Sequence, residues 1–317
     1  MATHAMIEEL ETLRAPLTGY CYRLLGSAAD TDDAVQETII RASSAADRHD
    51  PARGRLTTWV HRIATNVCLD MLRAAKRRAL VADVGETTGN GDHFGAPCPE
   101  LWVEPMPDGR LIDSDPAASA EQRESVRLAF IAALQHLAPR QRAVLVLRDV
   151  LGFSARETAE LLESTVASVT SALQRGRATL ERTRPEPSDQ REPARREQRE
   201  LLRRYVEAFE NHDVAALTSV LREDAVTSMP PFRWRVDGAV EIAALMGDSD
   251  SCAGARLVPC LVNGEPGFGQ YRPADDGLLR PFALIWVSVR GGRIGQQITF
   301  LGTADRFAEF GLPATLD

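Results

Sequence analysis

Lysine is almost absent from this 317-residue chain, since Lys76 is the single lysine among 37 basic residues. Cysteine is sparse as well. The five cysteines form no CxxC pair and no cluster with histidine. Because a structural zinc site needs four converging ligands, this spacing argues against a bound metal. We predict neither a metal nor a cofactor, and we expect reduced, buried cysteines.

Long apolar stretches are missing too. The longest clear apolar run covers residues 282–287, far fewer than the roughly 20 residues that a transmembrane helix needs. The amino terminus shows no signal-peptide pattern. These absences predict a cytoplasmic protein that does not contact a membrane.

The charge of the chain is negative overall but unevenly distributed. The formal net charge is −8 and the sequence pI is about 5.4, which is unusual for a protein that binds nucleic acid. Residues 53–78, however, carry seven basic groups and one acidic group. Residues 81–121 carry nine acidic groups and one arginine. Local charge is therefore a better guide to binding partners than net charge.

Residues 137–180 have the pattern of a helix-turn-helix unit. Ser154 and Glu157 have the spacing of a capping box at the start of a helix, and Thr165 is a plausible cap for the next helix. A preceding helix is expected over 137–148. In the last helix the helical period predicts that Val166, Val169 and Leu173 face inward, and that Ala167, Ser168, Ser171 and Arg175 face outward.

Small polar side chains with one arginine suit a helix that enters the major groove of DNA. The alternative is a helical hairpin that only packs. Arginines around the unit favour DNA, because a guanidinium binds phosphate oxygens in pairs. These arginines are Arg140, Arg142, Arg148, Arg156, Arg175, Arg177 and Arg182.

A second cationic helix is expected over residues 57–78. Its apolar face holds Val60, Ile63, Ala64, Val67 and Met71, and its polar face holds Arg62, Asn66, Arg73 and Arg77. Such a stripe suits contact with a nucleic-acid backbone, although a solvated helix face has the same composition. Trp59 is either a stacking platform for an unpaired base or part of the core.

The remaining pattern divides the chain into three domains and two linkers. Residues 1–80 read as helical, with a first helix through Leu10, Leu13, Leu17 and Leu24 and a second capped by Thr31 or Asp32. An acidic linker covers 81–122, the helix-turn-helix domain 123–184, and a charged linker 185–197. The final domain, 198–317, is expected to be α+β, with helices first and a curved antiparallel sheet after them. Its last two strands, on either side of Gly291-Gly292, read as a hairpin.

Together the two helical regions resemble bacterial sigma factors. The segments Asp32–Thr38 and Gly54–Asp70 resemble the second conserved region of these proteins, and 137–180 resembles the fourth. The order, without a third region, is that of the extracytoplasmic-function group. The tail from about 198 resembles a SnoaL-like domain of the NTF2-like superfamily, which is a cone with a cavity.

The resemblance implies partners and roles. Core RNA polymerase would be bound through its clamp helices and flap, with Asp33, Gln36, Glu37 and Arg41 on the clamp helices. The −10 promoter element would lie on Arg62, Asn66, Asp70, Arg73 and Arg77, with the 47–55 loop near a flipped-out base. The −35 element would be read by Thr165, Ser168, Ser171 and Arg175. The acidic linker would thread toward the nucleic-acid channel of the polymerase. The carboxylates at Asp32, Asp33 and Glu37 also fit a simpler role, because they favour the helix dipole.

The expected function is promoter recognition without bond chemistry, so no catalytic residue is predicted. Met229, Phe232 and Trp234 either line an apolar ligand pocket in the tail or pack in its core. His212 and Asp213 are expected at the surface, in a turn between helices. We expect the tail to regulate the helical regions. The rival hypotheses are a one-component DNA-binding regulator with a ligand domain and, more distantly, an enzyme housed in the tail.

Overall fold

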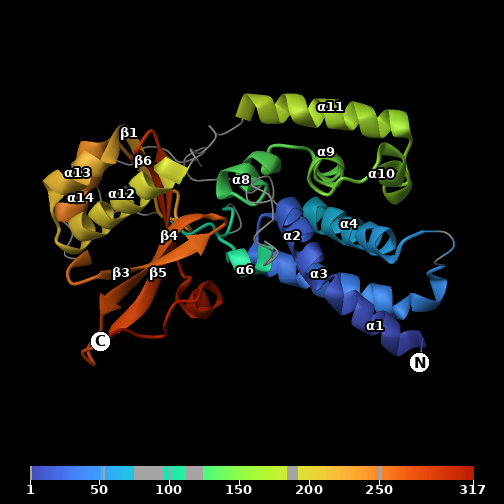
Figure 1. The fold of residues 1–317 in the computed structure, drawn as a ribbon, viewed down its shortest axis with the longest axis horizontal. Helices are drawn as coiled ribbons and strands as arrows, with labels where there is room; N and C mark the ends of the chain where they lie inside the picture. The colour runs from blue at the N-terminus through green and yellow to red at the C-terminus, as the bar shows by residue number, and fades with distance from the viewer. Residues whose placement is uncertain are drawn as a thin grey trace. The chain divides into compact units, whose positions relative to one another are not determined.

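The computed structural model describes residues 2–50, 52, 54–74, 96–99, 102–111, 124–183, 192–248 and 252–317. Two compact units divide the chain. The first comprises residues 1–78 and 103–185, and the second comprises 79–102 and 186–317. Figure 1 shows helices throughout the first unit and a sheet with helices in the second. Among the described residues, no helix is both long and apolar enough to cross a bilayer.

The first helical bundle consists of α1 (Ala2–Thr12), α2 (Arg14–Leu25), α3 (Ala28–Ser44) and α4 (Leu56–Ala74), with a 3-10 turn, η1, at Ala46–Arg48. The single first helix predicted through Leu24 is wrong, because the chain breaks at Leu13 into α1 and α2. Leu17, Leu24, Val60 and Ala64 are fully buried in its core. The apolar stripe predicted for the long helix therefore does face inward at these positions.

The start of α3 corrects the predicted cap. Ser27 is the N-cap, and its Oγ accepts a hydrogen bond of 3.1 Å from the Asp30 amide. The Thr31 hydroxyl instead donates to the Ser27 carbonyl within the helix, at 2.5 Å. Gly26 (φ +69°) ends α2 in the left-handed conformation one residue earlier, which leaves Ser27 extended as a cap must be.

The second helical bundle follows the short helix α6 (Asp108–Leu111). It consists of α8 (Leu128–Gln135), α9 (Pro139–Leu145), the π-helical turn η3 (Val146–Val150), α10 (Ala155–Leu161) and α11 (Val166–Thr183). The helix expected over 137–148 thus begins at Pro139 and widens to a π-helical turn at Val146. The predicted capping box is confirmed, because Ser154 and Glu157 exchange hydrogen bonds at the start of α10.

The second unit has the predicted order of helices before strands. Its helices are α12 (Glu192–Glu210), α13 (Val214–Val220) and α14 (Ala239–Asp248). Its strands are β1 (Leu221–Ser228), β2 (Arg235–Asp237), β3 (Arg256–Val262), β4 (Glu265–Pro273), β5 (Leu279–Arg290) and β6 (Arg293–Leu301), followed by a 3-10 segment, η5 (Ala304–Phe310). Helix α12 begins within the region where the sequence predicts a charged linker.

The strands form one sheet in the order β2-β1-β6-β5-β4-β3. The β5–β6 hairpin is confirmed, with Arg290 opposite Arg293 at the turn. The expectation of a wholly antiparallel sheet is wrong, since β1 pairs with β6 in parallel, with Ser228 opposite Ile298. Parallel neighbours need a long connection, and the chain between β1 and β6 is long enough because β2, α14 and three further strands intervene.

Both faces of the sheet are covered. Tyr205 and Phe209 from α12 pack with Phe268 in the main core of the unit. On the C-terminal segment, Phe307 packs edge-on against Tyr271, with 5.2 Å between ring centroids. The buried Tyr205 hydroxyl donates a 2.8 Å hydrogen bond to Gln297 Oε1 on β6, which ties α12 to the sheet.

Tyr205→Phe should lower the free energy of unfolding by about 1–2 kcal/mol, because the buried Gln297 oxygen loses its donor. Urea unfolding of the full chain, followed by tryptophan fluorescence, measures the change. Thr218→Val is the control, since the Thr218 hydroxyl is exposed and bonds only within its own helix. Equal stability of the two variants would contradict a structural role for the Tyr205–Gln297 bond.

Candidate nucleic-acid interface

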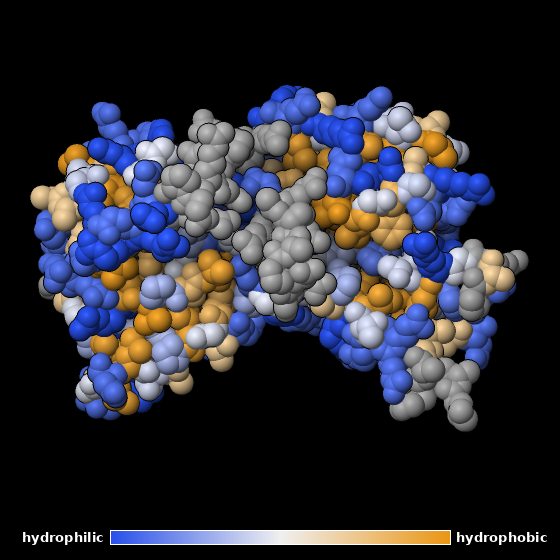
Figure 2. Space-filling view, in the orientation of Figure 1, coloured by the Kyte–Doolittle hydropathy of each residue, from blue (hydrophilic) through white to orange (hydrophobic). Residues whose placement is uncertain are grey.

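Helix α11 presents one exposed polar face. Ser168, Ser171 and Arg175 are exposed, whereas Val169 and Leu173 are buried as predicted. In Figure 2 hydrophilic side chains dominate along α11, at the top of the view. The Thr165 hydroxyl accepts a 3.1 Å hydrogen bond from the Ser168 amide, so Thr165 caps the helix on the same exposed end. The α11 face therefore offers hydroxyls and a guanidinium beside a helix N-terminus.

Val166 corrects the predicted inward face, because 47% of its surface is exposed. It occupies the first position of α11, ahead of the first buried residue, Val169. Periodicity alone assigns such a terminal residue to the apolar stripe.

The arginines around the helix-turn-helix have different environments. Arg177 forms a two-point ion pair with Asp149, at 2.7 and 2.9 Å, and so anchors α11 to η3. Arg148 donates to the Phe153 carbonyl, and Arg156 pairs with Glu160. The prediction that Arg142 contacts phosphate is wrong, because its side chain is buried within unit 1. Arg175 has no intramolecular partner in the described part of the chain, which leaves its guanidinium available to a ligand.

The polar face predicted on α4 is present. Asn66, Asp70 and Arg73 are exposed and Arg62 is half-buried, while Val60, Ala64 and Val67 are buried beneath them. Arg73 pairs with Asp70 at 2.5 Å, one helical turn away. Arg77 lies outside the described residues. Trp59 is half-buried and contacts the His49 ring at 5.3 Å, next to the 47–55 loop.

Helix α3 carries a third exposed face. Asp33, Gln36 and Arg41 are exposed, and Arg41 pairs with Glu37 at 2.6 Å. Sequence reasoning missed Ile40, which lies among them with 49% of its surface exposed, while its neighbour Ile39 is buried. The signal was available, because only Ile39 has the spacing of the inward stripe with Val35 and Ala42. Ile40 therefore adds one exposed apolar side chain to an otherwise charged and polar face.

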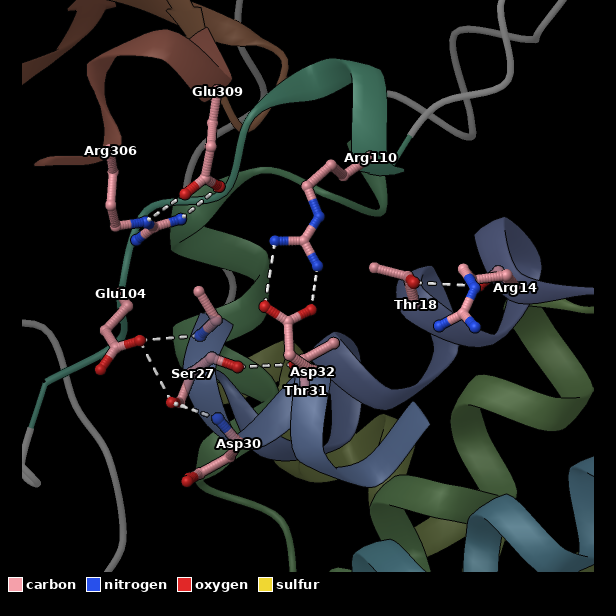
Figure 3. A network of polar contacts seen from close by, with 11 residues as sticks. Arg14, Thr18, Ser27, Asp30, Thr31, Asp32, Glu104, Arg110, Arg306 and Glu309 are labelled. Carbon is pink, nitrogen blue, oxygen red and sulfur yellow. Dashed lines mark hydrogen bonds and ion pairs between the residues drawn. The ribbon is translucent and has the colours of Figure 1, made fainter. Parts of the chain in front are cut away.

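Residues 102–111, inside the predicted acidic linker, are bound closely where they are described. Tyr22 donates from its hydroxyl to the Glu104 carbonyl at 2.6 Å, and the Glu104 amide donates to Gly26 at 3.0 Å. The Glu104 carboxylate accepts from the Ala28 amide at 2.7 Å and from the Ser27 hydroxyl at 3.1 Å (Figure 3). A carboxylate in this position satisfies the free amides at the start of α3 and complements its dipole.

Arg110 adds an ion pair to this segment, because its guanidinium faces the Asp32 carboxylate on α3 (Figure 3). Trp102, at the start of the same segment, belongs to unit 2, where its indole nitrogen donates to the Pro231 carbonyl at 2.8 Å. The Cys98 amide donates to the same carbonyl at 2.8 Å. Consecutive parts of one linker are thus bound by different units.

In the second unit, the predicted pocket residues lie in the core. Trp234 is buried in the core cluster, and Met229 and Phe232 pack against it. A small apolar cavity between α12, α13 and α14 is lined by other residues: Ala208, Phe209, His212, Asp213, Val214, Leu217, Ala243, Met246 and Cys252. Asp213 is exposed, as expected, and its carboxylate caps α13 by accepting from the Ala216 amide. A ligand pocket at Met229, Phe232 and Trp234 stays a prediction.

Metal-binding geometry is absent from the described residues, where no three histidine, cysteine, aspartate or glutamate side chains cluster to hold an ion. Cys252 lines the small cavity, and burial raises the pKa of its thiol, which keeps this group neutral.

Comparison with known families finds two matches. Residues 10–78 match the model of sigma-70 region 2, and residues 127–180 match that of sigma-70 region 4. The first match contains α2 to α4, and the second contains α8 to α11. These are the helices that carry the three exposed faces.

Curated relatives extend the likeness to the whole chain. The chain is 39% identical to a Mycobacterium tuberculosis protein named ECF RNA polymerase sigma factor SigG, over 96% of this chain and 83% of that protein. It is 31% identical to SigJ of the same organism, over 69% of this chain and 62% of that protein. The crystal structure of SigJ aligns with a TM-score of 0.60 at 23% identity, covering 97% of this chain and all of that one. That structure supports the fold, including the α+β unit.

The capping box at α10 should titrate at unusually low pH. The hydrogen bonds from Ser154 lower the pKa of the Glu157 carboxyl. A lowered folded-state pKa means that this carboxylate stabilises the fold above its unfolded pKa, and that the contribution is lost as the pH falls through the folded pKa. An NMR titration of the Glu157 side chain should give a midpoint below the usual glutamate range. Ser154→Ala removes the hydroxyl but keeps the backbone amide that donates to the carboxylate, so the midpoint should rise part of the way toward that range. An unchanged midpoint would contradict a contribution of the Ser154 side chain.

Proposed function

The chain belongs to the extracytoplasmic-function sigma factors, which bind core RNA polymerase and direct it to promoters, and we propose that α11 and α4 are its two DNA-reading surfaces. The observation that supports this most directly is the exposed face of α11, where Arg175 stands unpaired within the described residues. In this proposal α11 enters the major groove at the −35 element.

The chemistry of the α11 face fits that task. A helix N-terminus and backbone amides favour a phosphate, and Ser168 and Ser171 offer short donors that fit close to base edges. Arg175, two turns further along, can donate in pairs to a phosphate or to a guanine edge. The Arg177–Asp149 ion pair links this helix to η3.

We assign the −10 element to α4, although the individual contacts that this face offers are weaker than those of α11. Asn66 and Arg73 are exposed, and Arg73 already shares its charge with Asp70. Such a face makes only a few phosphate contacts. When polymerase holds both DNA-reading helices at the right spacing, the second contact becomes intramolecular and the total affinity rises without new contacts.

Core polymerase is proposed to bind the exposed face of α3. Asp33, Gln36, Glu37 and Arg41 surround Ile40 there, which gives an apolar centre with a charged rim. Apolar centres of this kind contribute most of the affinity at interfaces, while the charged rim sets orientation and association rate. The clamp helices are the expected site on the polymerase for this face, and the flap is the expected site for the helix-turn-helix.

The C-terminal unit is proposed to regulate the helical regions and to have no enzymatic activity. Its small cavity is apolar, and burial raises the pKa of the Cys252 thiol that lines it, so this group is neutral. A regulatory route is available through the linker. Cys98 and Trp102 of the linker donate hydrogen bonds to the Pro231 carbonyl of the C-terminal unit. Glu104, two residues after Trp102, caps α3, the proposed polymerase-binding helix.

Ile40→Arg should weaken binding to core polymerase by placing a charge at the centre of the α3 face. We expect affinity to fall at least about tenfold, as for a central interface residue. Size-exclusion co-elution with core polymerase that lacks a sigma factor measures this loss. Val240→Arg is the matched control, since Val240 is an exposed valine (66%) of the C-terminal unit. If the wild-type chain fails to co-elute, the proposed function itself is wrong.

Arg175→Ala should reduce initiation at promoters that depend on a −35 element by roughly tenfold, because one bidentate contact contributes about 1–3 kcal/mol. Co-elution with core polymerase should be unchanged. Single-round transcription at two salt concentrations measures the effect. Arg14→Ala removes an equal charge that is paired with Glu11, far along the chain from α11, and serves as the control. Equal initiation by both variants would remove Arg175 from the reading face.

A further inference from the structure

An arginine cluster lies at one end of the sheet in the C-terminal unit, where β5 ends and β6 and β1 begin. Its members are Arg222, Arg290 and Arg293. Arg290 and Arg293 are directly opposite each other across the β5–β6 turn. Arg293 Nη1 also donates to the Leu221 carbonyl, next to Arg222 in the chain, at 3.4 Å. Three strands therefore bring a guanidinium group to the same end of the sheet.

Glycines shape the backbone around the cluster. Gly291 and Gly292 both have a positive φ, +56° and +70°, which the tight turn between the two strands requires. An added Cβ at Gly295 would lie 3.1 Å from Arg222 Cδ and 3.8 Å from Arg290 Cδ. The bare backbone at Gly295 therefore leaves room for both aliphatic stems, which brings the two arginines together.

Carboxylates balance only part of this charge. Asp224 accepts hydrogen bonds from Arg222 Nε and Nη2, at 2.8 and 3.0 Å, and Glu223 is its exposed neighbour in β1. The hydrogen bond from Arg222 and, more weakly, the charge of Arg290 lower the pKa of the Asp224 carboxyl. Arg290 makes no side-chain hydrogen bond within the described part of the chain, and Arg293 is exposed. The cluster therefore keeps an excess of positive charge.

The fold gains no stability from placing these charges together. Arg290 and Arg293 are opposite each other in an antiparallel pair, where like charges destabilise a sheet. The formal net charge of the chain is −8, so the cluster does not follow from a basic composition. A bound anion would offset the repulsion, and a guanidinium suits this task because it donates in pairs to phosphate oxygens.

A further arginine extends the cationic surface onto α12. Arg204 is exposed, and its Nη2 donates to Ser219 Oγ at 3.0 Å, just before β1 begins. Its hydrogen-bond partner is neutral, whereas the preceding Arg203 pairs with Glu200 and Glu207. The positive surface at the end of the sheet therefore continues onto the helix that follows the second linker.

The chain connects this surface to α11 over a short distance. Helix α11 ends at Thr183, and α12 begins at Glu192. In any arrangement of the two units, the connection between them spans at most about 30 Å, and Arg204 lies roughly 18 Å further along α12. The arginine cluster is thus tethered near any duplex that α11 binds. This step rests on the proposed function, which assigns α11 to the −35 element.

We propose that the arginine cluster is a third DNA-binding surface of this protein, which contacts the phosphate backbone of the duplex beside the −35 element without reading its sequence. Such a contact is independent of base identity and depends strongly on salt, because bound phosphates release their counterions. The tether makes this contact intramolecular once α11 is bound, so even weak phosphate contacts add to the affinity for a promoter.

Arg290→Gln combined with Arg293→Gln should weaken binding of the full chain to duplex DNA and make it less sensitive to salt. Fluorescence anisotropy with a labelled duplex that lacks promoter sequence, repeated over a series of salt concentrations, measures both effects. Each phosphate contact contributes about 0.9 to the slope of log affinity against log salt concentration, so the slope should fall by roughly 1–2. Glutamine keeps a polar donor at each position, so the turn should remain folded.

Arg256→Gln combined with Arg280→Gln is the matched control. It removes the same number of charges from the same sheet, but Arg256 pairs with Glu210 and Arg280 pairs with Asp276. Its salt slope should equal that of the wild-type chain. Equal slopes for the two glutamine variants would overturn the proposal.

Arg290→Lys combined with Arg293→Lys separates the loss of charge from a disturbance of the turn. This variant should retain the wild-type slope, because the slope counts neutralised phosphates and lysine keeps the charge. A slope as low as that of the glutamine variant would overturn the proposal, since charge would then not be the cause.

These measurements use the full chain without polymerase, so they are independent of co-elution with core polymerase. If the wild-type chain fails to co-elute while the glutamine variant of the cluster lowers the slope, the proposed function is wrong and the DNA-binding surface is supported. If that variant instead loses co-elution at an unchanged slope, the cluster binds a protein partner, and the proposal is overturned.

Discussion

The hydrogen bonds from the Arg142 guanidinium to the Leu24 carbonyl and to Gln135 determine how the second helical bundle lies on α2. Arg142 Nη1 donates both to the Leu24 carbonyl at the end of α2 and to Gln135 Oε1 on α8, and Nη2 donates to the carbonyls of Gln135 and Leu137. The orientation of α10 and α11 follows from α9, through η3 and the Arg177–Asp149 ion pair. The orientation of the exposed α11 face therefore depends in part on Arg142, a buried residue.

Because lysine is almost absent, arginine supplies nearly all the basic side chains of this chain. These arginines have three physical roles. Buried guanidinium groups, as in Arg23, join elements through neutral oxygens. Half-exposed ones, as in Arg177 and Arg110, pair with carboxylates and fix helices or the linker. Fully exposed ones, as in Arg175, remain available to a ligand. The fork geometry of the guanidinium allows all three, since it donates in several directions at once.

The linker is the least expected part of the structure. Its composition, acidic and without hydrophobic period, indicates a loose tether. Glu104 nevertheless caps α3, and Tyr22 holds the same residue by its carbonyl, although the two lie 82 positions apart in the chain. Trp102, two positions earlier in the chain, belongs instead to the C-terminal unit, where its indole nitrogen donates to the Pro231 carbonyl.

Much of the fold was predictable because it follows from the local spacing of apolar, capping and turn residues. The capping box at Ser154 and Glu157, the apolar stripe of α4 and the β5–β6 hairpin all depend on residues within a few positions of one another. The predictions that failed concern residues at the ends of helices and single residues on helix faces. Ser27 caps α3 because Gly26 turns the chain, and Val166 is exposed at the first position of α11. Ile40 was missed although the inward stripe of Val35, Ile39 and Ala42 leaves it on the outer face of the helix.

By itself, the sequence determined the kind, order and amphipathic faces of the helices and strands, since these follow from side-chain spacing along a regular backbone. Only the tertiary structure decided which arginines are buried and which are exposed, and which strand pairs in parallel. The Arg142–Leu24 contact spans 118 positions. Periodicity cannot report a contact over that distance, because the energy of a buried charge depends on acceptors that only the folded chain brings around it.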